Sequence, residues 1–487
     1  MEQSTPKELE EGAVVKDGAL VDQDNDADEF ERTGTAWSGA AHCITAVIGA
    51  GVLALPYSVG ALGWAGGPIM IIMFAVVSMY ASLLLSDAYR YPGPDTGRRN
   101  RTYMACVKSF LGPRQVAFAG TVQYVVLIII GIGYTVTAAI SMVTIHRSHC
   151  FHVNNPCKPY IWRYAVIFGA IQLLFSQIPD LHSVTLVSVV AAIMSIGYAS
   201  IGLGLSIGKA TEHSHGHGTV EGFPISEEGP AEKAYLIMAA LGQTGCSRPQ
   251  AMCVLRSVCF HYIQDTIKAV GNPPTERYQM RKASVIGISV TTFFYISIGC
   301  IGYAGFGDDT PANLLTGFGF YNPYWLVDIA NLFVVIHLIG TWQVISQPWF
   351  AFVEDTTYRL LPQSTWLHSG FSFYIPGLGR QRFTYFRLVW RSAYVCFCTV
   401  MAALLPFFND IVGIIGSLGF WPMSIHFPTE MHIAQQKLPA SSFKAILLRC
   451  LNVFFFFIAV AGIIGNVNGV RVDTEGYVAF GNGYSGK

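Results

Sequence analysis

The sequence predicts an all-helical integral membrane protein with about eleven transmembrane helices. Hydrophobic residues make up 52% of its 487 residues and charged residues only 12%, and the mean hydropathy is +0.43. These values are typical of membrane proteins and exclude an ordinary soluble domain. Apolar stretches long enough to cross a bilayer, which takes about 20 helical residues, recur along the chain.

Each of these stretches is predicted to form one span, and the sixth has the weakest apolar character. In chain order the predicted spans are Ala36–Gly60, Ala65–Tyr89, Val116–Ile145, Tyr160–Ile178, Ser183–Ile207, Lys233–Tyr262, Ala283–Phe306, Trp325–Val353, Tyr385–Pro406, Phe408–Phe427 and Ala445–Val467.

The first span is interrupted by Gly49-Ala50-Gly51 and then by Pro56. A helix broken inside a membrane leaves backbone N–H and C=O groups unpaired, which is tolerated only where protein, solute or water fills the gap. A solute path is therefore the leading hypothesis. The alternative is a glycine-rich face for helix packing, which is common in membranes.

The N-terminal segment, residues 1–33, holds eleven acidic residues against Lys7, Lys16 and Arg32 and lacks the apolar core of a secretory signal. We expect a disordered cytosolic tail, either a solvated leader or an acidic segment that binds a partner. With the N-terminus placed in the cytosol, twenty of the thirty Lys and Arg residues fall in segments on the cytosolic side, seven in segments on the outer side and three within spans. Such a bias marks the cytosolic side, so an odd span count places the C-terminus outside.

Cysteine and histidine positions predict one disulfide and no metal site. Cys150 and Cys157 share the outer loop after the third span, where an oxidising environment lets them pair. His213, His215 and His217 alternate in a Gly-rich outer loop without a framing set of ligands, which favours an ordinary exposed loop over a metal site.

Several separate motifs, in this order, resemble the plant amino acid permeases of the amino acid/auxin permease family. They cover the chain from about Thr33 to Leu438. The motifs are Thr33-Gly-Thr-Ala-Trp37, His42-Cys-Ile-Thr-Ala-Val-Ile-Gly-Ala-Gly-Val52, Gly131-Ile-Gly-Tyr134, Gln177-Ile-Pro-Asp180, Ser200-Ile-Gly-Leu-Gly204, Gly302-Tyr-Ala-Gly-Phe-Gly307, Asn313-Leu-Leu-Thr-Gly-Phe-Gly-Phe-Tyr-Asn-Pro-Tyr-Trp325, Asp328-Ile-Ala-Asn331 and His337-Leu-Ile-Gly340.

The resemblance implies the leucine-transporter-like fold of the wider superfamily, in which two five-helix repeats have opposite orientation and helices 1 and 6 are broken. The transporter domain would span residues 34–468. It would contain a first repeat at 34–207, a second at 233–434 and an extra helix at 444–468, before an extracellular tail at 469–487. The resemblance further implies proton-coupled amino acid symport in the plasma membrane, driven by the proton gradient, with the lipid bilayer as partner and no cofactor or nucleic acid.

The unwound part of span one is the expected substrate site. Backbone N–H groups at Ile48, Gly49, Ala50 and Gly51 would face a substrate carboxylate, aided by the positive end of the half-helix beyond them. Glycine suits this place because a side chain would hold the ligand away from the backbone. The hydroxyl of Tyr134 would donate to the same carboxylate, as a tyrosine in the matching span does in the wider fold, unless it only packs there.

Histidines and an aspartate inside spans are the expected proton-coupling groups, because ionisable side chains are costly in a bilayer and imidazole titrates near neutral pH. His337 lies near the middle of span eight and His42 about 10 Å before Gly49. The alternative for each is one fixed hydrogen bond to a carbonyl. Asp328 and Asn331 are neighbours on one face of span eight. These two side chains would bind the substrate ammonium group or order water. The alternative role of Asp328 is a solvated gate or a helix–helix bond.

The interval from Gln243 to Tyr262 in span six departs from the family. It is longer and more polar than expected, and it contains Arg248, Pro249 and Arg256, which are costly at the centre of a bilayer. A gene-model error, a degenerate transporter and an arginine that binds an anionic substrate all explain it, and the first is favoured because both flanks are intact. A non-transporting sensor and a carrier of an auxin-like solute therefore remain alternatives to an amino acid symporter. An enzyme is not expected, since no nucleophile–base pair lies in the spans.

Overall fold

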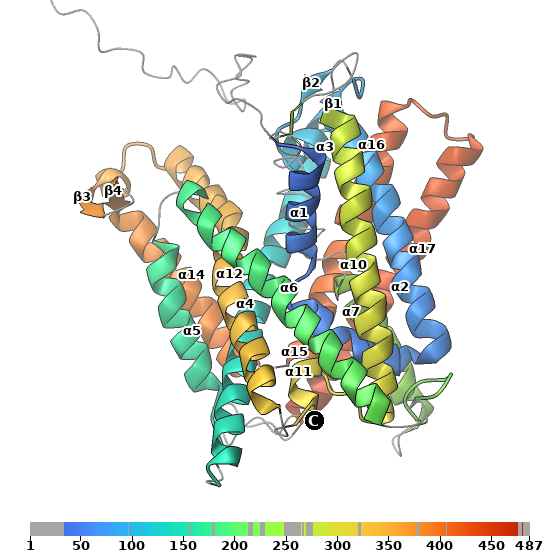
Figure 1. Ribbon diagram of the computed structural model, residues 1–487. Helices are drawn as coiled ribbons and strands as arrows, with labels where there is room; N and C mark the ends of the chain where they lie inside the picture. The colour runs from blue at the N-terminus through green and yellow to red at the C-terminus, as the bar shows by residue number, and fades with distance from the viewer. Residues whose placement is uncertain are drawn as a thin grey trace, which may run out of the picture.

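The computed structural model describes residues 34–95, 97–154, 157–177, 181–212, 218–224, 229–247, 264, 267–268, 276–319, 323–375, 379–405, 407–475 and 480. Long helices run side by side through most of this part of the chain, and the strands form only two small antiparallel hairpins (Figure 1). The predicted acidic tail and most of the interval from Gln243 to Tyr262 lie outside the described residues.

The first half of the chain begins with a helix that stops halfway. Its elements are α1 (Ala36–Val47), the 3-10 turn η1 (Ala50–Ala54), α2 (Leu55–Ala88), β1 (Arg90–Tyr91), β2 (Arg98–Arg99), α3 (Tyr103–Leu111), α4 (Pro113–His152), α5 (Ile161–Ser176) and α6 (Leu181–Glu212). Thr35 caps α1, and its side chain accepts a hydrogen bond from the Ser38 N–H.

The second half begins with α7, after the connection at residues 213–229. Its elements are α7 (Pro230–Ser247), α10 (Glu276–Phe306), η3 (Gly307–Asp309), α11 (Leu314–Gly317), α12 (Tyr324–Leu360), α13 (Thr365–His368), β3 (Gly370–Ile375), β4 (Gly379–Thr384), α14 (Tyr385–Leu404), α15 (Phe408–Phe420), the π-helical η4 (Trp421–His426), α16 (Phe427–Gln435) and α17 (Phe443–Thr474).

Eight helices in the described ranges are long and apolar enough to cross a membrane, and α5 is a shorter apolar helix. They correspond to nine of the predicted spans. The remaining two are the broken ones. Span one is divided among α1, η1 and the start of α2, and span six is described only as α7. The extra helix α17 continues past the predicted end at residue 468 to Thr474.

Pro56 does not interrupt span one as predicted. It stands at the second position of α2. Backbone N–H groups in the first turn have no partner within the helix, so the N–H that proline lacks is not needed there. The boundary to span two is instead Gly63, whose φ of 70° is left-handed. A Cβ on Gly63 would lie 2.2 Å from the Val220 carbonyl oxygen, so glycine is required there by both conformation and space.

The loop after α6 is held against this kink of α2. The N–H of Phe223 donates to the Gly60 carbonyl at 2.9 Å, and the N–H of Trp64 donates to the Thr219 carbonyl at 3.2 Å. The Thr219 N–H in turn donates to the hydroxyl of Tyr303 on α10 at 2.9 Å. The loop therefore joins α2 and α10 at the end opposite the strand hairpins (Figure 1).

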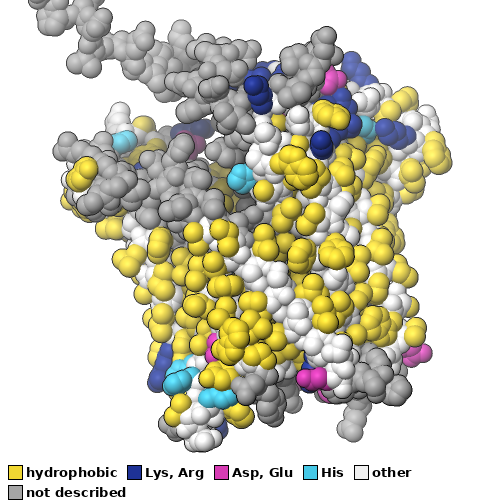
Figure 2. Space-filling view, viewed as in Figure 1, with side chains coloured by type: hydrophobic (Ala, Val, Ile, Leu, Met, Phe, Trp, Pro, Cys, Tyr) yellow, Lys and Arg dark blue, Asp and Glu magenta, His cyan; other side chains and the backbone are white. Residues whose placement is uncertain are grey.

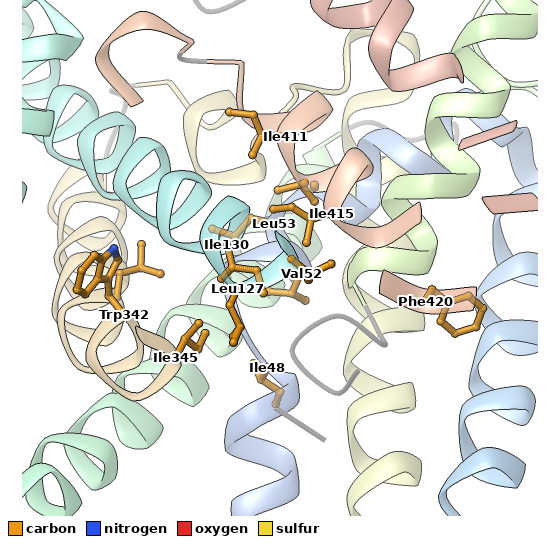
Figure 3. Packing of buried hydrophobic residues seen from close by; sticks show 14 of the residues in the cluster. Ile48, Val52, Leu53, Leu127, Ile130, Trp342, Ile345, Ile411, Ile415 and Phe420 are labelled. Carbon is orange, nitrogen blue, oxygen red and sulfur yellow. The ribbon is translucent and has the colours of Figure 1, made fainter. Parts of the chain in front are cut away.

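Buried aliphatic side chains from several helices meet around the gap between α1 and α2. Figure 3 shows Val52 and Leu53 of η1 close to Ile130 of α4 and Ile415 of α15. All four are at most 3% exposed. The unwound segment is thus enclosed by packed helices rather than placed at the protein surface.

Charged residues gather at the end of the molecule where α1 begins, and a broad hydrophobic belt covers the helices below it (Figure 2). Buried Glu276 pairs there with Arg90 at 2.9 Å and with Arg99 at 3.1 Å. Asp87, at the end of α2, pairs with Arg277 at 2.7 Å and Arg281 at 2.8 Å. These pairs fix α2 and the β1–β2 hairpin to the start of α10.

A second buried acid holds a different group of helices. Glu354 of α12 pairs with Arg391 at 2.8 Å and with Arg387 at 2.9 Å, both on α14. Arg391 also donates to the Ser176 carbonyl at the end of α5 at 2.9 Å and lies over the ring of Phe350. A single buried carboxylate thereby joins α5, α12 and α14.

Candidate functional site

The break between α1 and η1 supplies backbone polar groups in the middle of the helix bundle. The hydrogen bonds of α1 end with the Ile48 N–H, which donates to the Ile44 carbonyl at 2.8 Å. Gly49 is fully extended, with ψ of −177°, and the next turn begins with the Val52 N–H on the Gly49 carbonyl at 3.1 Å. The predicted substrate-binding backbone, Ile48 to Gly51, therefore lies in a real interruption of the helix.

Tyr198 of α6 binds the end of α1. Its hydroxyl donates to the Ile48 carbonyl oxygen at 3.3 Å, and its side chain is completely buried. The carbonyls of a final helical turn have no partner within the helix, so this hydroxyl satisfies one that the break leaves open.

Tyr134 of α4 faces the break from another side. An ideal Cβ built on Gly49 would lie 4.0 Å from the Tyr134 hydroxyl oxygen, the one contact within that radius among the described residues. Because Gly49 has no side chain, the space between its extended backbone and this hydroxyl stays open. The structure brings Tyr134 together with Ile48 and Gly49, as the predicted site requires.

His337 of α12 is buried beside Tyr198. The two rings meet edge to face with centroids 5.7 Å apart. The Nδ1 of His337 lies 2.8 Å from the Ala191 carbonyl oxygen on α6. Because a carbonyl only accepts, Nδ1 carries a hydrogen. Contacts thus run from Ile48 through Tyr198 to His337.

The other ring nitrogen of His337 has a partner that suits two protonation states. Thr341 Oγ1 lies 3.3 Å from Nε2 and 2.8 Å from the His337 carbonyl oxygen. In the neutral ring, Nε2 accepts from the threonine hydroxyl. In the protonated ring, Nε2 donates to Oγ1 while the hydroxyl hydrogen turns to the carbonyl. The same neighbours can therefore form the hydrogen bonds of either protonation state.

Asn331 offers a buried acceptor on the same helix. Its side chain is 0% exposed, and Nδ2 donates to the Val327 carbonyl at 3.0 Å. Its Oδ1 has no hydrogen-bond partner among the described residues. A buried amide oxygen without a partner is costly, which makes it a candidate acceptor for a substrate ammonium group.

Asp328 is not part of this cluster. Its Oδ2 accepts from the Ser148 hydroxyl of α4 at 3.2 Å. Ser148 lies fourteen residues after Tyr134 on one helix, which corresponds to about 21 Å along its axis. Asp328 therefore forms the helix–helix bond that the sequence left as an alternative, far from the break.

His42 lies on an exposed face of α1, about 9 Å before Ile48 by the helical rise. Within the part of the chain that is described, no hydrogen bond or ring contact joins it to His337. The two predicted proton-coupling histidines are thus separate: one is buried beside the break and the other faces outward from α1.

The end of α4 carries the predicted disulfide. Cys150 and Cys157 are joined, with Cα atoms 5.9 Å apart. His146 lies close to both sulfur atoms, and its ring contacts the Tyr164 hydroxyl. Since the sulfurs are bonded to each other, they are not thiolate ligands, and the group does not form a metal site.

Tyr198 and Thr341 were not predicted from the sequence. A tyrosine within an apolar span needs a hydrogen-bond partner for its hydroxyl. The place of Tyr198 in such a span could therefore have indicated a buried contact. Thr341 stands one turn after His337, a spacing that places two side chains on one helix face. Near the end of α7, the amide oxygen of Gln243 accepts from the Ser58 hydroxyl of α2 at 3.2 Å.

Comparisons with known proteins show the family to which the chain belongs. The family described as "Transmembrane amino acid transporter protein" matches residues 32–472. The chain is 43% identical over 463 residues to amino acid permease 3 of Arabidopsis thaliana, which covers 94% of this chain and 95% of the relative. It is also 43% identical over 455 residues to amino acid permease 6 of that plant, covering 92% and 93%.

A solved structure shares the fold at low sequence identity. The crystal structure of MhsT in complex with L-phenylalanine aligns with a TM-score of 0.51 and 10% identity, covering 88% of this chain and 98% of that one. The architecture is thus the leucine-transporter-like fold.

Proposed function

Because the chain belongs to the family of transmembrane amino acid transporter proteins, we propose that it is a proton-coupled amino acid symporter that works by alternating access. The observation that carries this proposal is the break between α1 and η1, with Tyr198 bound to Ile48 and Tyr134 facing Gly49. The relatives named amino acid permeases support an amino acid as the solute.

In this proposal the substrate carboxylate binds the backbone N–H groups from Gly49 to Gly51. They lie at the start of η1 and α2, where the helix dipole favours a negative charge. The Tyr134 hydroxyl donates to the same carboxylate. The substrate ammonium group binds carbonyl oxygens at the end of α1, where the dipole is negative, and the unpaired Oδ1 of Asn331 is its side-chain candidate.

His337 is the proposed proton carrier beside the substrate. Its Nε2 can hold or release a proton while Thr341 keeps a hydrogen bond to it, and its ring lies against Tyr198. A change in charge at His337 would therefore act on the Tyr198 hydroxyl and on the Ile48 carbonyl next to the substrate. His42 would receive the proton later, on the side of the break where α1 begins.

The proposed orientation places the N-terminus in the cytosol, the C-terminus outside and the protein in the plasma membrane. Lys and Arg side chains gather at the end where α1 begins (Figure 2), and an excess of these residues marks the cytosolic side. The joined Cys150 and Cys157 lie at the opposite end of α4, which suits an oxidising exterior.

Uptake of a labelled neutral amino acid tests the proposal. This chain would be expressed in transport-deficient cells, and uptake would be measured at about pH 5 and about pH 7.5, on either side of the value for free imidazole, with and without a protonophore. Faster uptake at acid pH that the protonophore removes is the expected result. A protein that reaches the cell surface and binds the amino acid without accumulating it would be a sensor and would contradict the proposal.

A further inference from the structure

Asn466 of α17 is completely buried where that helix contacts α7. Its side chain is 0% exposed, although α17 lies on the side of the bundle opposite α5 and α14 and turns many apolar side chains outward (Figure 1). Its Nδ2 donates to the Ala239 carbonyl of α7 at 3.1 Å and to the Gly462 carbonyl of its own helix at 2.7 Å. Both hydrogens of the amide nitrogen are thus used, and one of them joins α17 to α7.

Glycines bring the two helices into backbone contact around this asparagine. A Cβ on Gly465 would overlap the backbone nitrogen of Ala239, and a Cβ on Gly462 would lie 3.0 Å from the Cα of Gly242. Small residues at such positions allow transmembrane helices to approach closely. The backbones of α7 and α17 therefore meet directly, with the Asn466 side chain enclosed between them.

Gln243 extends this contact from α17 to α2. Its Nε2 lies 3.5 Å from Asn466 Oδ1, a long hydrogen bond, and its Oε1 accepts from the Ser58 hydroxyl at 3.2 Å. Gln243 is 2% exposed and Ser58 is 1% exposed. A glutamine amide has one donor end and one acceptor end, and both ends are used here. The three side chains thus form a buried chain of hydrogen bonds across α17, α7 and α2.

This chain ends beside the proposed substrate site. The Ser58 hydroxyl also lies 3.3 Å from the carbonyl oxygen of Ala54, the last residue of η1. In addition, α7 packs against both η1 and α2, and η1 begins at Ala50, directly after the extended Gly49. A shift of α7 would therefore move the turn whose N–H groups are proposed to bind the substrate carboxylate.

The hydrogen bonds of Asn466 leave it no role as a substrate ligand. Its Oδ1 and Nδ2 both have partners among the described residues, whereas the Oδ1 of Asn331 has none among them. A buried amide that loses its partner carries the cost of its desolvation. Asn466 therefore acts on other residues, by keeping α7 where its own hydrogen bonds are satisfied.

We propose that Asn466 is a positioning residue, which holds α7 against η1 from α17 and so sets the geometry of the substrate-binding backbone. The helix that follows the two predicted repeats thus contributes to substrate affinity without touching the substrate. This inference rests on the proposed binding of the substrate at the break between α1 and η1, and it does not depend on proton coupling.

Amide hydrogen exchange in the purified full-length protein, without ligand, is the first test. The variant Asn466→Leu keeps the size and branching of the side chain but removes its amide. We expect exchange in residues 230–247 and in residues 50–54 to become about tenfold faster, the order expected when two hydrogen bonds between transmembrane helices are lost. Unchanged exchange in residues 50–54 would overturn the proposal.

Asn452→Leu is the matched control on the same helix. Asn452 is also buried, but its Oδ1 accepts from Trp421 Nε1 at 2.5 Å and its Nδ2 lies 3.0 Å from His426 Nδ1, both on η4. This variant should speed exchange in residues 421–426 and leave residues 50–54 unchanged. Faster exchange of residues 50–54 in both variants would show general loosening of α17 and would overturn the specific role of Asn466.

Affinity for labelled L-leucine, measured by equilibrium binding to the purified protein without a gradient, is the second test. Asn466→Leu should raise the Kd about tenfold for the same two lost bonds. Ser58→Ala, a milder change at the other end of the chain, should raise it less. Because both act through Gln243, the double variant should bind no more weakly than Asn466→Leu alone. Additive effects, or an equal rise for Asn452→Leu, would overturn the proposal.

These measurements separate this proposal from the proposed symport. If the unmodified protein binds L-leucine but moves no protons, the symport fails and the comparison of Kd values still decides the role of Asn466. If the unmodified protein does not bind L-leucine, the exchange of residues 50–54 still decides whether Asn466 positions η1.

Discussion

The hydroxyl of Tyr198 lies 3.3 Å from the carbonyl oxygen of Ile48 and donates a hydrogen bond to it. This bond connects α6 to the last turn of α1, immediately before the extended Gly49. Since the ring of Tyr198 also contacts His337, one side chain touches both the proposed substrate backbone and the proposed proton carrier.

Changing Tyr198 to Phe should therefore impair transport more than stability. The variant leaves a buried carbonyl without its partner, which costs about 1–3 kcal/mol. Tyr103→Phe is a matched control, since the Tyr103 hydroxyl donates to the Met423 carbonyl at 3.2 Å away from the break. We expect a similar drop in thermal stability for both variants and a loss of uptake for Tyr198→Phe alone. Equal uptake by the two would separate Tyr198 from the transport site.

His337→Ala should abolish the stimulation of uptake by outside acid while the protein still reaches the membrane. The variant removes the ring nitrogen that Thr341 faces and with it the proposed proton carrier. Uptake against outside pH is the measurement, with surface labelling to count the protein. Thr341→Val is the comparison, and it should shift the pH dependence without removing it. An unchanged pH profile of His337→Ala would exclude this residue from coupling.

Substitutions of Gly49 should weaken substrate binding in proportion to side-chain size. A methyl group there meets the Tyr134 hydroxyl at 4.0 Å, an ordinary contact, so Gly49→Ala should fold and transport with a raised KM. Gly49→Leu would fill the space beside the extended backbone and should stop uptake. Gly204→Ala on α6, where a Cβ meets no described atom within 4 Å, serves as the control. Normal KM values for both Gly49 variants would place the substrate elsewhere.

Arg391→Met should destabilise the protein, because the buried Glu354 carboxylate keeps Arg387 as its one ion-pair partner among the described residues. The loss should stay below the about 3–5 kcal/mol of a buried charge with no partner. A second change, Glu354→Gln, removes the charge and should restore much of the loss. Thermal unfolding of the single and double variants in detergent provides the comparison. If the double variant is no more stable than Arg391→Met, the buried charge is not the reason for the destabilisation.

The sequence predicted the transmembrane helices well because apolar length is a local property. Spans three, five, seven and eight lie within helices α4, α6, α10 and α12. The break at Gly49 was predicted from its glycines. Pro56 was misread because proline is equally compatible with the start of a helix. Only the close approach of Val220 explains why Gly63 is the true boundary.

Contacts between distant residues were beyond the reach of the sequence. The bond of Tyr198 to Ile48 joins residues 150 positions apart, and the pair of Arg391 with Glu354 appears in the sequence only as a charge within a span. The β3–β4 hairpin, with strands of six residues each, lies in the connection between predicted spans eight and nine. The contact of Asp328 with Ser148 is the helix–helix bond that the sequence left as an alternative.

Proton movement driven by the amino acid itself tests the central claim most directly. The purified protein would be reconstituted in liposomes that contain a pH-sensitive dye, and a neutral amino acid would be added outside without an imposed pH gradient. The proposed symporter should acidify the interior on addition of the amino acid, and His337→Ala should not. Entry of labelled amino acid with no change in internal pH would contradict proton coupling.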